Sequence, residues 1–187
     1  MATAEPRGFR TATRTCLPAV AALIVAGFGG SAAAAEPTSI VVRGDVQIGR
    51  FLVQRDGTLD GAIRAFGKPT SLRRGRYQDC TARWRPIGLR IGFYNLGGRN
   101  PCLPQYGYFS NATMVGRHWV TARGLRLGDP ARKLHGLYSP RRFTGSWAWL
   151  LTRYSPYGDG GYYPGLAAKI HRGWVTAFRI RYPAGGD

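Results

Sequence analysis

The stretch RGLRLGDPARKLHGLYSP, Arg123–Pro140, decides the predicted fold because a similar stretch, RDGTLDGAIRAFGKPTS, occurs earlier at Arg55–Ser71. Within each stretch the apolar positions are spaced i, i+4 and i+7, which is one face of a short helix. Both close in a Gly/Pro turn, and aromatic, strand-like sequence follows. The pattern predicts one scaffold used twice, a short helix packed on a sheet. At an offset of 68 positions the aligned apolar pairs are Leu59 with Leu127, Ile63 with Ala131, and Phe66 with Leu134.

The N-terminal segment has the three-part layout of a secretory signal peptide. Met1–Thr15 carries three arginines, Cys16–Phe28 is an apolar run, and small residues continue to Ala35. A run of 13 residues is short of the roughly 20 that span a bilayer. We therefore predict that residues 1–35 are a signal peptide cleaved near Ala35, with no transmembrane segment afterwards. The alternative is an uncleaved membrane anchor.

The chain is strongly basic. Its net charge is +18, and residues 36–187 keep 24 of the 27 basic and eight of the nine acidic residues, a net charge of +16. Such a charge favours acidic partners, among them wall polymers, lipid headgroups, nucleic acid and acidic proteins. The alternative is that the positive charge reflects amino-acid composition and not a binding function, because the arginines are scattered and a GC-rich genome favours arginine over lysine.

Two cysteines, Cys80 and Cys102, remain after the predicted cleavage. In an exported chain such a pair is most simply a disulfide, which closes a loop of about 20 residues and contributes about 3 kcal/mol in the loop-entropy model. The alternatives are weaker, since clustered histidines for a metal site and a C-x-x-C redox motif are both absent from the sequence.

Alternating apolar residues predict two β-hairpins. The first lies within Arg76–Tyr94 and turns at Pro86–Gly88, and the second joins Leu166–Ile170 to Trp174–Tyr182. We expect Arg83 and Arg90 to lie outside the core. In the first hairpin the predicted core face carries Trp84, Leu89, Ile91 and Phe93. In the second, the predicted shared face carries Trp174, Thr176, Phe178, Ile180 and Tyr182.

Helix ends are marked by capping and breaking residues. Asp56 or Thr58 is a candidate N-cap for the first helix, which Gly67 ends. The second helix is predicted over Pro130–His135, where Gly136 stops it and His135 caps its end.

These elements predict an α+β fold with two related helix-plus-antiparallel-hairpin repeats, 36–115 and 116–187, forming a sheet with short helices on one face.

The residues Leu59–Pro69 (LDGAIRAFGKP) and Leu127–Pro140 (LGDPARKLHGLYSP), with the hairpins after them, resemble the tandem architecture of beta-lactamase inhibitory proteins. The single-copy relative is the small outer-membrane assembly lipoprotein domain. The chain also resembles exported proteins of GC-rich actinobacteria. The architecture implies a concave sheet face that binds a partner protein, but no contact residue can be carried over. This chain differs in lacking a lipobox and in its basicity.

Catalytic motifs are weak in this sequence. His118, His135 and His171 lack the spacing of a metal site, and no G-x-S-x-G nucleophile turn is present. The acidic residues lie near turns, and no spacing in the sequence places two of them together as the carboxylate pair of a glycoside hydrolase. Asp159 offers at most one calcium ligand. We therefore predict a non-enzymatic protein without metal or cofactor.

Aromatic and arginine residues are the candidate binding residues, because tyrosine, tryptophan and arginine are enriched at binding hot spots. Tyrosines gather around the glycine-rich loop Ser155–Gly165. The alternative is that they cover the sheet edge. The candidates are Trp147, Trp149, Arg153, Tyr154, Tyr157, Tyr162, Tyr163, Arg179 and Arg181.

The sequence thus predicts a secreted or envelope-located binding protein whose partner is an envelope or extracellular protein. Specific binding of nucleic acid is not expected. Two alternatives stay open: a basic module attached to an anionic envelope polymer, and a cell-wall hydrolase with two acids or a Ser/His pair in one pocket.

Overall fold

The computed structural model describes residues 39–155 and 161–182. The chain divides into two units, Met1–Ala35 and Glu36–Asp187, and all described residues belong to the second. The predicted signal peptide and Tyr157 lie outside the described residues. The described unit has short helices and two sheets, so the predicted α+β class is confirmed.

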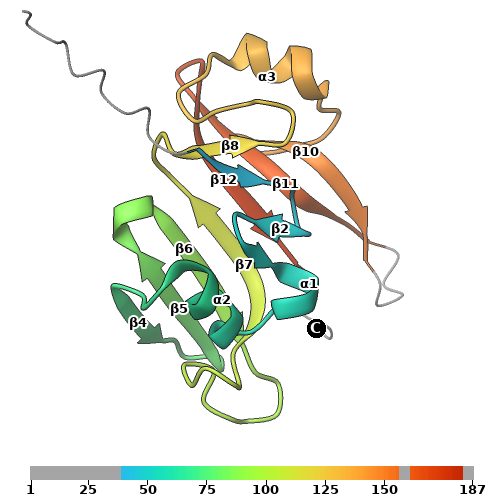
Figure 1. The fold of residues 1–187 in the computed structure, drawn as a ribbon. Helices are drawn as coiled ribbons and strands as arrows, with labels where there is room; N and C mark the ends of the chain where they lie inside the picture. The colour runs from blue at the N-terminus through green and yellow to red at the C-terminus, as the bar shows by residue number, and fades with distance from the viewer. Residues whose placement is uncertain (1–38, 156–160, 183–187) are drawn as a thin grey trace, which may run out of the picture. The chain divides into compact units, whose positions relative to one another are not determined.

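The larger sheet has eight strands, and every neighbouring pair is antiparallel (Figure 1). Its strand order is β4-β5-β6-β7-β12-β11-β10-β9. A single 3₁₀ turn, η1 (Arg85–Ile87), joins β5 to β6. The strands are β4 (Ser71–Arg74), β5 (Asp79–Trp84), β6 (Leu89–Tyr94), β7 (Tyr108–Met114), β9 (Phe143–Thr144), β10 (Trp147–Tyr154), β11 (Tyr162–His171) and β12 (Trp174–Arg181).

The same order of elements occurs twice along the chain. Helix α2 (Leu59–Phe66) precedes β4 to β7, and helix α3 (Ala131–Tyr138) precedes β9 to β12. The last strands of the two sets, β7 and β12, pair at the centre of the sheet, from Met114 opposite Phe178 to Asn111 opposite Arg181. That the two halves are related repeats stays a prediction.

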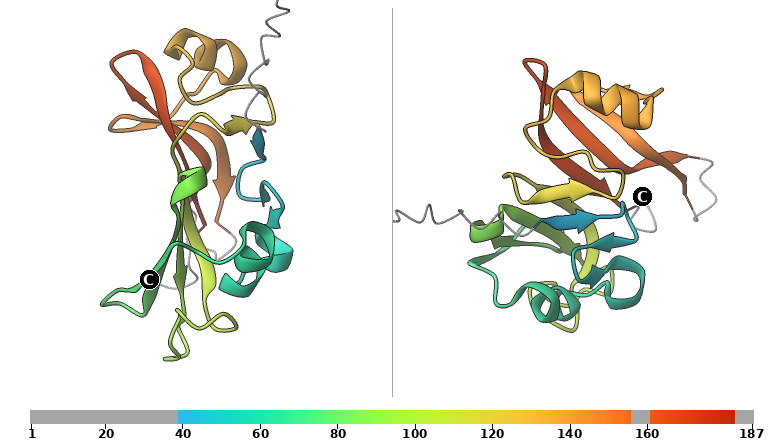
Figure 2. Two further views of the ribbon diagram at one scale, coloured as in Figure 1. Left: turned by 60° about the vertical axis from the view of Figure 1, so that its left-hand side comes forward. Right: turned by 45° about the horizontal axis from the view of Figure 1, so that its top comes forward.

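A smaller sheet covers one face of the larger one. It contains β1 (Ile40–Val42), β2 (Gln47–Ile48), β3 (Phe51–Leu52) and β8 (Trp119–Thr121), with β1 and β8 parallel. The short helix α1 (Val53–Asp56) follows β3 directly. Figure 2 shows α1, α2 and the smaller sheet on the same side of the larger sheet.

One hydrophobic core fills the space between these layers. Phe51 of the smaller sheet, Phe93 and Phe178 of the larger sheet, and Leu134 of α3 are all fully buried in it. The buried Trp119 donates its indole N–H to the Ile87 carbonyl at 2.6 Å, which satisfies the polar atom of a large apolar side chain.

The first helix begins and ends at predicted residues. Thr58, one of the two candidate caps, accepts a hydrogen bond from the Gly61 N–H at 3.1 Å. The helix ends at Gly67, which has φ +78° and ψ −174°, a conformation that favours glycine.

The second helix begins within one residue of its predicted start and extends beyond its predicted end. It begins at Ala131, so Leu127 lies before it, because Gly128 adopts φ +93° in the preceding turn. It then runs through Gly136 to Tyr138 and ends at Ser139, whose N–H donates to the His135 carbonyl. Glycine costs a helix interior only about 1 kcal/mol, and buried Leu134 anchors the helix on the core. His135 therefore lies inside the helix, and the predicted end at Gly136 is wrong.

A β-bulge changes the predicted face of β12. Lys169 pairs with Ala177 and Ile170 with Val175, so Thr176 has no partner in the ladder. Between the bulge and the start of β12, the alternation of buried and exposed side chains is therefore shifted by one residue. Val175 is therefore buried, and Trp174 is 53% exposed. The prediction that Trp174 and Thr176 share a face with Phe178 and Ile180 is therefore wrong, because the first two are exposed and the last two are buried.

The predicted disulfide is present. Cys80 in β5 is bonded to Cys102, with their Cα atoms 5.2 Å apart. Cys80 is fully buried. The bond joins the irregular segment 95–107 to the strand, so both cysteines have a structural role.

Candidate binding face on the large sheet

The two faces of the larger sheet carry different side chains. One face packs into the core, and we call the opposite face, which neither the smaller sheet nor the helices cover, the open face (Figure 2). Successive side chains of a strand alternate between the faces. One row of cross-strand partners on the open face runs from β4 to β10: Ser71, Arg83, Arg90, Thr113, Arg179, Ala167 and Trp149.

Four of the predicted site residues form an aromatic cluster on the open face, which we define as Trp147, Trp149, Tyr154 and Tyr162. Tyr154 and Tyr162 are more than half exposed and pack edge to face, with ring centroids 5.3 Å apart. The two tryptophans, on β10, are half-buried. The cluster presents large, rigid aromatic area at the surface, which suits partner contacts.

Two guanidinium groups lie against this cluster. Arg179 has its Cζ 4.2 Å from the ring centroid of Trp147, and Arg142 lies 4.7 Å from that of Tyr162 and 5.8 Å from that of Trp149. Cation–π contacts of this kind hold the cations in place. Arg142 is not among the residues predicted from the sequence, because the irregular segment before β9 has no periodic pattern to place it.

Arg179 is partly desolvated by this packing. Its Nε atom is buried and has no hydrogen-bond acceptor within the described part of the chain. Burial lowers the pKa of Arg179 from its ordinary value, and the charge of Arg181 lowers it further. A buried donor without an acceptor is costly, so the position of Arg179 depends on its packing against Trp147.

Two other predicted residues lie on the covered side of the sheet. Arg153 forms an ion pair with Asp45 (Nε to Oδ1, 3.1 Å), and the hydroxyl of Tyr163 donates to Asp45 Oδ2 at 3.0 Å. The Asp45 side chain is only 3% exposed. Burial raises the pKa of Tyr163 well above its usual range, with Asp45 adding to the effect. The structure therefore uses Arg153 and Tyr163 to join the two sheets.

The remaining predicted residue with described coordinates is Arg181, which is exposed at the end of β12, opposite Asn111. Tyr162 and Tyr163 belong to strand β11, not to the loop in which the sequence analysis placed them. The structure thus brings together Trp147, Trp149, Tyr154, Tyr162 and Arg179, and it separates Arg153 and Tyr163 from them.

Basic side chains outnumber acidic ones on the open face, where Asp79 of β5 is the one acid among the described residues. Among the described residues four ion pairs form, and their acids are Asp45, Asp56, Asp60 and Asp129. These acids lie in the helices and in the turns of the covered side. The arginines of the open-face row take part in none of the four pairs, so this face is basic.

The described residues contain no group of three or more His, Cys, Asp or Glu side chains that is placed to hold a metal ion. Within the same residues, no helix combines the length and apolar character that crossing a bilayer requires.

Comparisons with known proteins give little further information. Neither a family model nor a curated protein matches the chain. One solved structure, an extracellular protein containing a SCP domain from Bacillus anthracis, is similar with a TM-score of 0.42 and 10% sequence identity. The match covers 68% of this chain and 43% of that protein, which is less than half its length. A likeness of this size carries no argument about function.

Proposed function

We propose that this chain is an exported, non-enzymatic binding protein that binds an envelope or extracellular partner protein with its open face. The observation that carries the proposal is the aromatic cluster with Arg179 and Arg142 packed against it. Hot spots of protein interfaces are enriched in tryptophan, tyrosine and arginine. The proposal agrees with the use of a sheet face in the beta-lactamase inhibitory protein architecture that the sequence resembles.

Two features support export. The N-terminal segment has the layout of a signal peptide. The Cys80–Cys102 disulfide is typical of proteins that fold in an oxidising compartment.

Attachment to an anionic envelope polymer is the second candidate function. The observation that favours it is the basic open face, whose arginines have no acidic partners among the described ion pairs. Contacts between exposed charges are screened by salt, whereas apolar contacts of an aromatic cluster are not. Salt dependence therefore separates the two candidates.

The test is a pull-down with the oxidised protein from the envelope fraction of the source organism, at low and at high salt. The proposal predicts one protein that stays bound at high salt. Capture of anionic polymer alone, with complete release at high salt, would replace it with the second candidate. Hydrolysis of cell-wall material by the same purified protein would contradict both.

A further inference from the structure

We infer that a second site on the open face, an arginine pocket on β4 to β6, binds a phosphomonoester group. The pocket lies in the half of the sheet opposite the aromatic cluster, so the inference is independent of the proposed function. Its volume is about 530 Å³. Its lining residues are Arg73, Arg74, Gly75, Arg76, Asp79, Thr81, Arg83 and Arg90.

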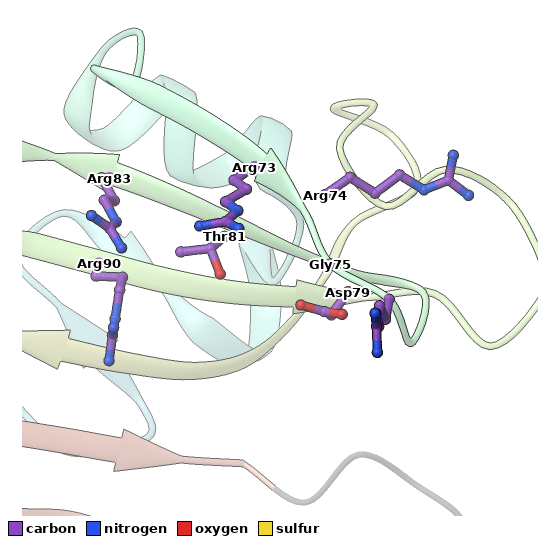
Figure 3. A pocket seen from close by; sticks show the side chains of 8 residues that line it. Arg73, Arg74, Gly75, Asp79, Thr81, Arg83 and Arg90 are labelled. Atoms are coloured by element: carbon purple, nitrogen blue, oxygen red, sulfur yellow. The ribbon is translucent and has the colours of Figure 1, made fainter.

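Strand register brings the pocket's donors together. Arg83 on β5 lies directly opposite Arg90 on β6, and Arg73 on β4 lies opposite Thr81. The two rows are two residues apart along the strand, about 7 Å. Figure 3 shows these four side chains on the same side of the sheet, and Arg74 pointing away from them. Arg73, Thr81, Arg83 and Arg90 therefore all line one hollow, and the Arg90 guanidinium extends toward β7, where its Nη2 lies 3.5 Å from the Thr113 hydroxyl.

The pocket lacks internal charge compensation. It has five arginines and one acid, Asp79, whose carboxylate accepts from the Tyr77 backbone N–H at 3.1 Å. Like charges directly opposite each other in a sheet are destabilising. Arg83 and Arg90 form such a pair, and within the described residues neither takes part in an ion pair. A bound anion would relieve this repulsion.

The number of donors favours phosphate over carboxylate. One guanidinium already matches the two oxygens and single charge of a carboxylate. A phosphomonoester presents three terminal oxygens and a charge of about −1.5 to −2 near neutral pH. The guanidinium groups of Arg73 and Arg83 and the Thr81 hydroxyl can donate to different oxygens of one such group, and Arg90 adds a third positive charge at the pocket.

A neighbouring hollow of about 450 Å³ provides matched controls. Arg83 and Arg90 line both hollows, whereas Arg73 lines only the arginine pocket and Arg85 lines only its neighbour. Arg73 and Arg85 are both exposed. Arg73→Gln and Arg85→Gln therefore remove the same charge from two neighbouring hollows, and only the first removes a donor from the pocket.

The experiment is calorimetric titration of the oxidised protein with inorganic phosphate at low salt, with a parallel sedimentation assay on phosphatidic acid vesicles and phosphatidylcholine vesicles as the blank. A hydrogen bond between charged groups is worth about a factor of ten or more in affinity. We expect Arg73→Gln and Arg83→Gln each to weaken binding about tenfold, and Arg85→Gln to leave it unchanged. Unfolding curves check that each variant is folded.

The two arms distinguish the source of the phosphate. Pocket-dependent binding in the titration assigns the site to free phosphate or a small soluble phosphomonoester, and pocket-dependent binding only to phosphatidic acid vesicles assigns it to a lipid headgroup. Either result supports the inference. Equal loss with Arg73→Gln and Arg85→Gln, or no binding in both arms, would overturn it. Trp149→Ala changes the aromatic cluster and leaves the arginine pocket intact. Loss of partner-protein binding in this variant can therefore be measured separately from phosphate binding.

Discussion

Arg179 of β12 lies against the ring of Trp147 of β10, with its Cζ 4.2 Å from the ring centroid, although strand β11 separates their two strands. The contact is possible because the residue opposite Arg179 on β11 is the small Ala167. It fixes a cation beside the aromatic cluster and leaves Nε of Arg179 buried without an acceptor in the described chain.

This contact should contribute measurably to stability. A cation–π pair at a partly exposed site is worth about 1 kcal/mol. A double-mutant cycle with Trp147→Ala and Arg179→Gln, measured by urea unfolding, should therefore give a coupling free energy of about that size. Additive effects of the two substitutions would show that the contact does not form.

The pair of Tyr163 and Asp45 predicts a loss of stability at high pH. The pKa of Tyr163 is raised in the folded protein by burial and by Asp45, so the folded state holds its proton more tightly than the unfolded state. The contribution of Tyr163 to the free energy of unfolding is fully present below the pKa of about 10 that tyrosine has in the unfolded chain, and it is lost as the pH rises above that value. Urea unfolding between pH 8 and 11 should show a steeper decline for the wild type than for Tyr163→Phe. Parallel curves for the two proteins would contradict this placement of Tyr163.

Removal of the disulfide should destabilise the fold. Cys80 and Cys102 are 22 residues apart, and closing a loop of that size contributes about 3 kcal/mol in the loop-entropy model. The Cys80→Ala/Cys102→Ala double variant should lose a free energy of unfolding of that order. Amide hydrogen exchange should show the largest loss of protection within segment 95–107. Unchanged protection there would mean that other contacts hold the segment.

Two glycines at helix positions should respond in opposite directions to alanine. Gly67 ends α2 with φ +78°, where a side chain costs about 1–3 kcal/mol, so Gly67→Ala should destabilise the protein. Gly136 lies inside α3, where alanine is favoured by about 1 kcal/mol, so Gly136→Ala should stabilise it. A Cβ at either position meets no other atom within 4 Å, so the backbone alone decides the sign. Thermal unfolding of both variants checks this, and a stabilising Gly67→Ala would contradict the end of α2.

Local patterns were sufficient to predict much of the fold. Period-two alternation identified the β5–β6 hairpin and placed Arg83 and Arg90 outside the core, and Thr58 and Gly67 marked the ends of α2. The cysteine pairing followed from the predicted export of the chain and the two cysteines left after cleavage of the signal peptide.

Long-range features had no local signal. The parallel pairing of β1 with β8 and the Asp45–Arg153 ion pair join residues far apart in the sequence. The bulge at Thr176 shifts the alternation by one residue without a distinctive residue to mark it. Net charge likewise could not show that Arg83, Arg90 and Arg179 lie on one face of the sheet, because that depends on strand order.

We propose that the open face binds the partner through its aromatic cluster. The most direct measurement compares partner capture at high salt by the wild type, by Trp149→Ala/Tyr162→Ala, and by Leu96→Ala, which truncates an exposed apolar residue in segment 95–107. We expect the double variant to lose the captured protein and Leu96→Ala to keep it. Equal capture by all three folded proteins would contradict the claim.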